Sequence, residues 1–199
     1  MEEIRMKKRI FICVCVLIMM AACLSACGEK GTPPVLTIDG KELTLGEFTP
    51  YNLPQGFECT LAGNYIPIGK MPANSWMSDL WSAKKDGETY IYFYVYNPSR
   101  EEVTYTGATI YKMSFCMNSE ENSYWAVNNV LVNGINFYGM NSDEVKAAMQ
   151  ALKAPRETSY GSLIYEDGQY SYTIRFDDNG VVEEVEIEMT IAKSYSEIS

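Results

Sequence analysis

The chain has 199 residues, with 16 Lys and Arg against 26 Asp and Glu, and its formal net charge is −10. This acidic balance argues against a nucleic-acid-binding surface, because phosphate groups demand a basic face. The chain contains no histidine, which removes Ser-His-Asp and Cys-His catalysis and the usual histidine-based metal sites. We therefore expect no cofactor and no metal.

The first 26 residues have the parts of a secretory signal. Residues 5–9 are basic, residues 10–24 carry no charge, and small residues precede Cys27. The uncharged run is shorter than the roughly 20 residues that a membrane-spanning helix needs. The sequence therefore predicts that residues 1–26 are a signal peptide. The alternative is a signal anchor that stays in the membrane.

Residues 24–27, Leu-Ser-Ala-Cys, resemble the lipobox of bacterial lipoproteins. The resemblance implies that Cys27 is acylated, with palmitate or a similar chain, and becomes the new N-terminus. Two acyl chains attach a protein stably to a bilayer, whereas one does so only marginally. We expect a protein that is lipid-anchored at the extracytoplasmic face of the cell membrane, with residues 27–34 as the lipidated cysteine and tether.

The mature chain would keep 173 residues, enough for one domain or two small subdomains. Removing residues 1–26 takes away four basic and two acidic side chains, which leaves 12 against 24 and a net charge of −12. Cys59 and Cys116 are the cysteines that follow Cys27. An exported protein permits a disulfide between them, but a buried free thiol is equally consistent with the apolar run around Cys116.

The first predicted element is a hairpin over residues 35–45, because Asp39-Gly40 separates two alternating segments. Residues 46–87 are rich in Gly, Pro and Asn and show no period, so we expect irregular structure with at most a short helix at 76–82. Residues 88–97 alternate tyrosine with apolar side chains, which predicts a strand. Further strands are expected over 104–116 and 124–132. Residues 35–132 would form a β-rich N-terminal subdomain.

The pattern changes at residue 141. Asn141 and Glu144 have capping-box spacing, and apolar side chains then recur at helical intervals at Val145, Ala148, Met149 and Leu152. This predicts a helix over 142–153 that ends before Pro155. Three alternating segments follow at 160–165, 170–176 and 184–191, separated by Asp-Gly and Asn-Gly turns. Residues 133–199 would form a helix-plus-meander subdomain. The predicted class is α+β: antiparallel sheets with one amphipathic helix packed on a C-terminal three-stranded meander.

Residues 139–145, Gly-Met-Asn-Ser-Asp-Glu-Val, resemble the motif that opens the helix in small envelope lipoproteins of the SmpA/OmlA type. There a strand ends in Gly-Met-(Thr/Ser), and the helix opens with an acidic residue and Val. The resemblance covers residues 130–191 and departs in one extra residue between Gly134 and Gly139. It implies the helix-plus-meander fold shared with the β-lactamase-inhibitor-protein-like group, and a role in binding or assembly.

Aromatic side chains are the strongest candidates for a contact surface. Four tyrosines fall on one face of the strand at 88–97, and two tryptophans precede it. If exposed, such a surface suits protein or glycan contact; if covered, it is core. The candidate contact residues are Trp76, Trp81, Tyr90, Tyr92, Tyr94 and Tyr96.

We therefore expect a non-catalytic binding or envelope-assembly module whose partners are the membrane, through Cys27, and a protein or glycan. The alternative is a cell-wall-active hydrolase that uses paired carboxylates. Its candidates are the acidic residues of the last predicted strand, Glu183, Glu184, Glu186 and Glu188. Alternating glutamates are more simply a charged solvent face that prevents edge pairing.

Overall fold

The structure is a computed structural model, and it describes residues 30–198 except 62–68 and 118–128. The contacts of Gly31–Ser199 group into one compact unit. The predicted signal peptide and lipobox lie outside the described residues. Within the described ranges, no helix has the length and apolar character needed to cross a membrane.

A three-stranded sheet contains the predicted hairpin. Strands β1 (Val35–Ile38) and β2 (Lys41–Thr44) pair antiparallel, and β10 (Val130–Val132) pairs antiparallel with the other edge of β1. Asp39 and Gly40 form the connecting turn with φ of 49° and 74°. Positive φ at both central residues is what a type I′ turn requires, so the Asp-Gly hairpin is confirmed.

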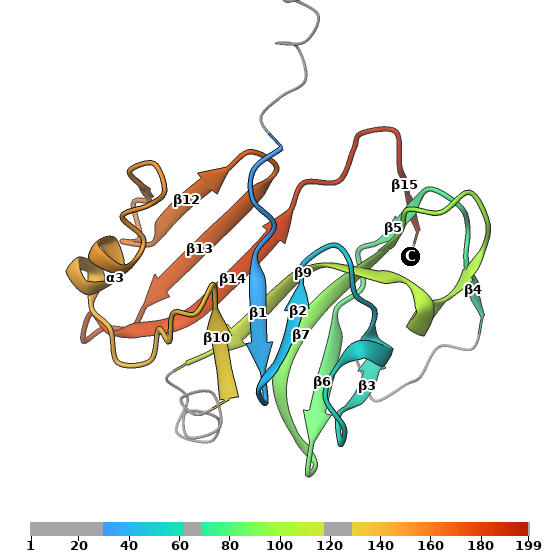
Figure 1. Cartoon of the computed structure of the whole chain (residues 1–199), viewed down its shortest axis with the longest axis horizontal. Coiled ribbons are helices and arrows are strands. Elements are labelled where there is room, and N and C mark those ends of the chain that lie inside the picture. The colour runs from blue at the N-terminus through green and yellow to red at the C-terminus, as the bar shows by residue number, and fades with distance from the viewer. Residues whose placement is uncertain (1–29, 62–68, 118–128, 199) are drawn as a thin grey trace, which may run out of the picture. The chain divides into compact units, whose positions relative to one another are not determined.

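A ten-stranded sheet forms the larger layer, in the order β11-β12-β13-β14-β9-β7-β5-β15, with β6 and then β3 branching from β7 (Figure 1). All its neighbours pair antiparallel except β5 and β15, which are parallel. Its strands are β3 (Glu58–Leu61), β5 (Ser75–Met77), β6 (Trp81–Lys85), β7 (Glu88–Asn97), β9 (Thr109–Cys116), β11 (Arg156–Glu157), β12 (Leu163–Asp167), β13 (Tyr170–Phe176), β14 (Val182–Met189) and β15 (Ser196–Ile198).

The predicted meander is confirmed as β12, β13 and β14, with β14 joined to β9 in the same sheet. The remaining short elements are the strand pair β4 (Lys70–Met71) and β8 (Val103–Thr104), and the 3-10 turns η1 (Pro50–Asn52) and η2 (Tyr105–Gly107).

The core lies between the two sheets. Leu36 and Ile38 of β1 belong to the same buried cluster as Ile91 and Val95 of β7. In Figure 1 the small sheet lies in front of β9 and β7. Main-chain hydrogen bonds tie the layers together where Ile110 donates to the carbonyl of Phe48 at 2.9 Å. This arrangement leaves the other face of the large sheet to polar and tyrosine side chains.

The prediction of an α+β class is wrong. The described residues are mostly β, with 48% strand and a single α-helix, α3 (Ser142–Ala148). The capping box forms as predicted: Asn141 accepts from the amides of Asp143 and Glu144, and Glu144 accepts from the amide of Asn141. The helix nevertheless has only seven residues, because Met149 already leaves the helical conformation at its C-cap. Such a short helix cannot form a layer, and the small sheet covers the core instead.

The prediction of irregular structure over residues 46–87 is also wrong. Strands β3, β4, β5 and β6 lie in it, and the helix expected at 76–82 is absent, since β5 and β6 occupy that range. Short strands are fixed by their partners rather than by their own pattern. Here β7 is long enough to hold both β6, through Glu88–Phe93, and β5, through Tyr96 and Asn97.

Candidate functional site

The predicted contact residues divide between the core and the surface. On β7, Ile91, Phe93 and Val95 are fully buried against the small sheet, and the tyrosines alternate to the opposite face. Tyr90, Tyr92 and Tyr94 are partly buried there, and Tyr96 is buried. Trp81 lies in the core, where its indole stacks on Phe93 at 5.8 Å between centroids and its Nε1 has no hydrogen-bond partner among the described residues. Trp81 therefore contributes no surface for contact with a partner.

A bulge brings a further tyrosine onto the open face. Tyr94 pairs with Lys112 and Val95 pairs with Ile110, so Tyr111 of β9 has no residue opposite it. A bulge of this kind redirects a side chain that strict alternation would send inward. The ring of Tyr111 lies 6.3 Å from that of Tyr94 and 5.9 Å from that of Tyr96.

These rings belong to one group, which we call the aromatic cluster. Trp76 meets Tyr111 edge to face, with centroids 6.5 Å apart and planes at 85°. Tyr195 lies 5.9 Å from Tyr96. The aromatic cluster consists of Trp76, Tyr94, Tyr96, Tyr111 and Tyr195. Of the six residues predicted from the sequence, the structure brings Trp76, Tyr94 and Tyr96 together in it.

A buried polar network holds Trp76 beside β7. The Asn97 side-chain amide donates to the carbonyls of Met71, Pro72 and Glu101 at 3.2, 2.8 and 2.8 Å. Ser75, also fully buried, donates its hydroxyl to the carbonyl of Pro72 at 2.7 Å. Buried carbonyls need such partners, so this network fixes the chain that enters β5 and, with it, the position of the indole.

The segment Thr190–Tyr195, which we call the strap, leads from β14, inside the large sheet, to β15, the last strand of the sheet order beyond β5 (Figure 1). The amide of Ser196 donates to the carbonyl of Asn74 at 3.1 Å, and β15 then runs parallel to β5. A pocket of about 420 Å³, the strap pocket, lies between the strap and the sheet. Its lining consists of Trp76, Tyr111, Glu188, Tyr195 and Thr190–Lys193.

The charged side chains that line the strap pocket are Glu188 and Lys193, and Lys112 and Glu197 lie near it. Burial raises the pKa of the Tyr111 hydroxyl, and the charges of Glu188 and Glu197 raise it further. Lys112 lies 3.1 Å from both Glu186 and Glu188, and its Nζ stands 5.6 Å from the centre of the Tyr94 ring. Burial lowers the pKa of Lys112, but the contacts with Glu188 and Glu186 outweigh it, so this pKa is raised and the amine stays charged.

The glutamates proposed for hydrolysis are engaged in ion pairs. Glu184 binds Arg175, Glu186 contacts both Lys112 and Arg175, and Glu188 binds Lys112. Glu184, Glu186 and Glu188 lie on the open face of β14 rather than converging across a cleft, and Glu183 is exposed at the register shift between β13 and β14. Arrangements of this kind serve sheet cohesion and give no acid and base pair on the two sides of a substrate bond.

Both described cysteines are free thiols, so the alternative of a disulfide is not realised in the structure. Burial raises the pKa of Cys59 to about 12. The pKa of Cys116 is also raised, by burial and then by the charges of Glu184 and Glu183. Thiols that stay protonated are poor nucleophiles. Among the described residues, no group of three or more Cys, Asp or Glu side chains has the arrangement of a metal site.

A second, larger pocket of about 620 Å³ lies between η1 and η2, where Phe57, Tyr105 and Cys59 contribute to its wall. The described residues of its lining include no charged side chain. It reaches Gly69, which adjoins residues 62–68 outside the described part of the chain. We therefore build no site on it.

Sequence reasoning missed Tyr111 and Tyr195. Tyr111 lies in a strand that was predicted, but a bulge has no signature in the alternation itself, and strict period two assigns Tyr111 to the other face. Tyr195 follows the last predicted strand, and its place in the cluster depends on the pairing of β15 with β5. The sequence offered one signal, the richness of tyrosine in the chain, with 15 residues.

Comparisons with known proteins found no matching protein family, no matching curated protein and no matching solved structure.

Proposed function

We propose that this protein is a lipid-anchored, non-catalytic binding module at the extracytoplasmic face of the cell membrane, and that the strap pocket is its contact site. The observation that carries the proposal is the aromatic cluster itself. Its rings come from β5, β7, β9 and the strap, and three of them line a pocket that is open to solvent. Aromatic side chains supply most of the energy at binding surfaces of this kind.

The anchor follows from Cys27 and from the short chain that leads to the sheet. The amide of Thr32 donates to Oδ2 of Asp167 at 2.9 Å, so the chain is tied to the sheet five residues after Cys27. Five residues reach at most about 18 Å when fully extended. Acyl chains on Cys27 would thus keep the binding module close to the bilayer. The likeness of residues 139–145 to the opening motif of envelope-assembly lipoproteins agrees with a role there.

Site-specific crosslinking in cells tests the contact site. A photoreactive benzoylphenylalanine replaces Tyr195 in the full-length protein, and the matched control carries it in place of Tyr160, which is 93% exposed and outside the pocket. We expect a crosslinked species at position 195 that is lost when Trp76→Ala is added, with folding checked by thermal unfolding.

Two results would contradict the proposal. The first is equal crosslinking at positions 195 and 160, which would show that the pocket is not a preferred contact. The second is turnover of cell-wall fragments by the wild-type protein that a single Glu184→Gln or Glu186→Gln change abolishes. That outcome would favour the hydrolase instead.

A further inference from the structure

The walls of the strap pocket suit a positive charge. The rings of Trp76 and Tyr111, which meet edge to face at 85°, both line it, and Tyr195 adds a third ring from the strap. The face of an aromatic ring is negative and attracts a cation within about 6 Å of its centre. The same cluster already holds one cation in this way, because Lys112 lies 5.6 Å from the centre of the Tyr94 ring.

The carboxylates near the pocket also favour a cation. Glu188 lines the pocket, and after burial the negative charges of Glu188 and Glu197 both raise the pKa of the Tyr111 hydroxyl. Lys112 neutralises only one of its two carboxylate partners, Glu186 and Glu188, and Arg175 is shared between Glu186 and Glu184. Three glutamates of β14 thus face two cations, and one negative charge is left over on this strand.

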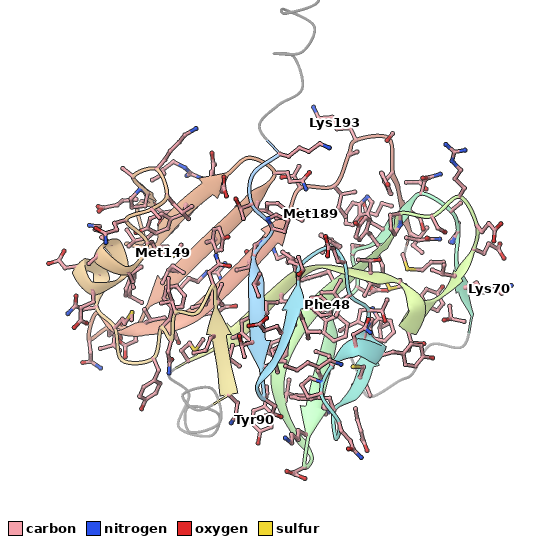
Figure 2. All side chains as sticks on the ribbon, in the orientation of Figure 1. Phe48, Lys70, Tyr90, Met149, Met189 and Lys193 are labelled. Atoms are coloured by element: carbon pink, nitrogen blue, oxygen red, sulfur yellow. The ribbon has the colours of Figure 1, made fainter. Side chains whose placement is uncertain are left out.

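Lys193 is the cation on the pocket rim. It is exposed on the outer bend of the strap, where Figure 2 shows its side chain directed away from the ribbon. Salt and water screen a charge in that position. If the ligand carries a negative group next to its positive one, the amine of Lys193 can pair with that negative group at the solvent side of the pocket.

Resting on the proposed binding function, we propose that the strap pocket binds an alkylated ammonium group, of the kind that choline carries. A bare ammonium group has three N–H donors, each of which needs an acceptor. The described lining offers three rings, the apolar side chains of Ile191 and Ala192, the hydroxyls of Thr190 and the two tyrosines, and a single carboxylate, Glu188, while the amine of Lys193 stands on the rim. Methyl groups on nitrogen can pack against such walls while the charge faces the rings and the carboxylate. At about 420 Å³ the pocket exceeds the size of this group, so it also accommodates part of the attached ligand.

The test compares choline with 3,3-dimethyl-1-butanol, which has the same shape without the charge. Both carry a nine-proton methyl signal, so saturation-transfer NMR gives their dissociation constants under identical conditions. The protein is the full-length chain in a polyoxyethylene detergent, which contributes neither ammonium groups nor sugars. We expect choline to bind at least about tenfold more tightly than the alcohol.

Variants tie the effect to the pocket. Glu188→Gln and Trp76→Leu should each weaken choline binding at least about fivefold. Glu184→Gln removes the same charge from the same strand outside the pocket and should change it less than about twofold. Glu188→Gln also breaks the ion pair between Glu188 and Lys112. Trp76→Leu keeps every ion pair and therefore tests the role of the pocket in choline binding independently.

Three results would overturn the inference: equal binding of choline and the alcohol, binding of neither, or tighter binding of butylammonium, which would assign the pocket to a bare ammonium group. The crosslink at position 195 separates these failures from failure of the proposed function. If that crosslink persists and still depends on Trp76, the pocket is a contact site for another class of ligand. If it is also absent, both the binding function and the ligand class are wrong.

Discussion

The indole of Trp76 meets the ring of Tyr111 edge to face in the wall of the strap pocket, although 34 residues of sequence separate them. The contact depends on two independent features: the hydrogen bonds of Asn97, which hold the start of β5, and the bulge that turns Tyr111 outward. The geometry of the pocket is thus set by a side-chain amide that binds main-chain carbonyls and by a main-chain bulge.

This relationship predicts which substitutions weaken partner binding. Trp76→Ala removes one wall of the pocket and should cost at least about 2 kcal/mol of affinity, as at other aromatic hot spots. Tyr94→Ala acts indirectly, by removing the ring that supports Tyr111, and should cost less. Titration of the partner captured at position 195 provides the measurement.

Glu184→Gln and Glu186→Gln serve as the controls for these aromatic variants. Both carboxylates bind Arg175 or Lys112 on the open sheet face and neither lines the strap pocket. We expect each to change the affinity by less than about 0.5 kcal/mol. A larger loss in these controls than in Trp76→Ala would place the contact on the glutamate stripe.

Trp81→Ala should act on stability instead. Trp81 has no exposed surface and stacks on Phe93, so its removal leaves a cavity and should cost about 3–5 kcal/mol of unfolding free energy. Trp76→Ala, at a half-buried side chain, should lower the unfolding free energy clearly less. Urea unfolding of both variants checks this, and equal losses would show that Trp76 is part of the core.

The sequence predicted those elements whose cause is local. The Asp39-Gly40 turn requires positive φ at adjacent residues, the Asn141–Glu144 capping box is a matter of spacing, and β7 alternates over its whole length. Each of these signals lies within a few residues, and each element forms as expected. The meander follows for the same reason, since its turns carry Asp-Gly and Asn-Gly.

The elements that the sequence did not predict depend on pairing partners far along the chain. Strand β6 forms because β7 holds it in register, and β3 forms on the other side of β6. Strand β15 forms because β5 offers an edge. The fold class was wrong for a related reason: the helical spacing runs to Leu152, but the helix ends after Ala148. The contact site required both Tyr111 and Tyr195, whose positions follow from a bulge and a long-range pairing.

The short helix should still contribute to stability through Val145. This side chain is fully buried, so Val145→Ala should cost about 2 kcal/mol, from lost apolar burial and the remaining cavity. Leu152 is only partly buried, and Leu152→Ala should cost less than the roughly 2–5 kcal/mol typical of a buried leucine. Chemical denaturation measures both. Gln150→Ala, at an exposed position, is the control and should change the unfolding free energy by less than about 0.5 kcal/mol. A negligible loss for Val145→Ala would show that the helix does not pack into the core.

Membrane attachment should depend on Cys27. Cys27→Ser removes the thiol that the lipobox resemblance marks for acylation, so the variant should not label with a fatty-acid probe and should remain uncleaved or leave the membrane fraction. Metabolic labelling with an alkyne fatty acid, read on a gel, checks this. Cys116→Ser is the matched control, because that cysteine lies in β9 and should leave labelling unchanged. Labelling of the Cys27→Ser protein would disprove the lipid anchor.

Alkaline pH should destabilise the fold through groups that burial keeps protonated. Burial raises the pKa of Cys59 from its ordinary value of 9.0 to about 12, and burial, followed by Tyr195 and Tyr170, raises that of Tyr96 from 10.0 to about 12. Above pH 9 the unfolded chain loses the thiol proton while the folded chain keeps it. The unfolded state then binds fewer protons, so the free energy of unfolding falls as pH rises from 9 toward 12. Below pH 9 this contribution is fully present and constant.

The two groups can be separated by where the fall begins. Cys59→Ala should flatten the decline between pH 9 and 10, before tyrosines titrate in the unfolded chain, and Tyr96→Phe should flatten it only above pH 10. Tyr160→Phe, at a side chain that is 93% exposed, is the control and should leave the slope unchanged. Urea unfolding at half-unit steps from pH 8 to 11 measures these slopes independently of each variant's stability at pH 8. An identical slope for Cys59→Ala and the wild type between pH 9 and 10 would mean that the Cys59 thiol ionises as readily in the folded protein as in the unfolded chain.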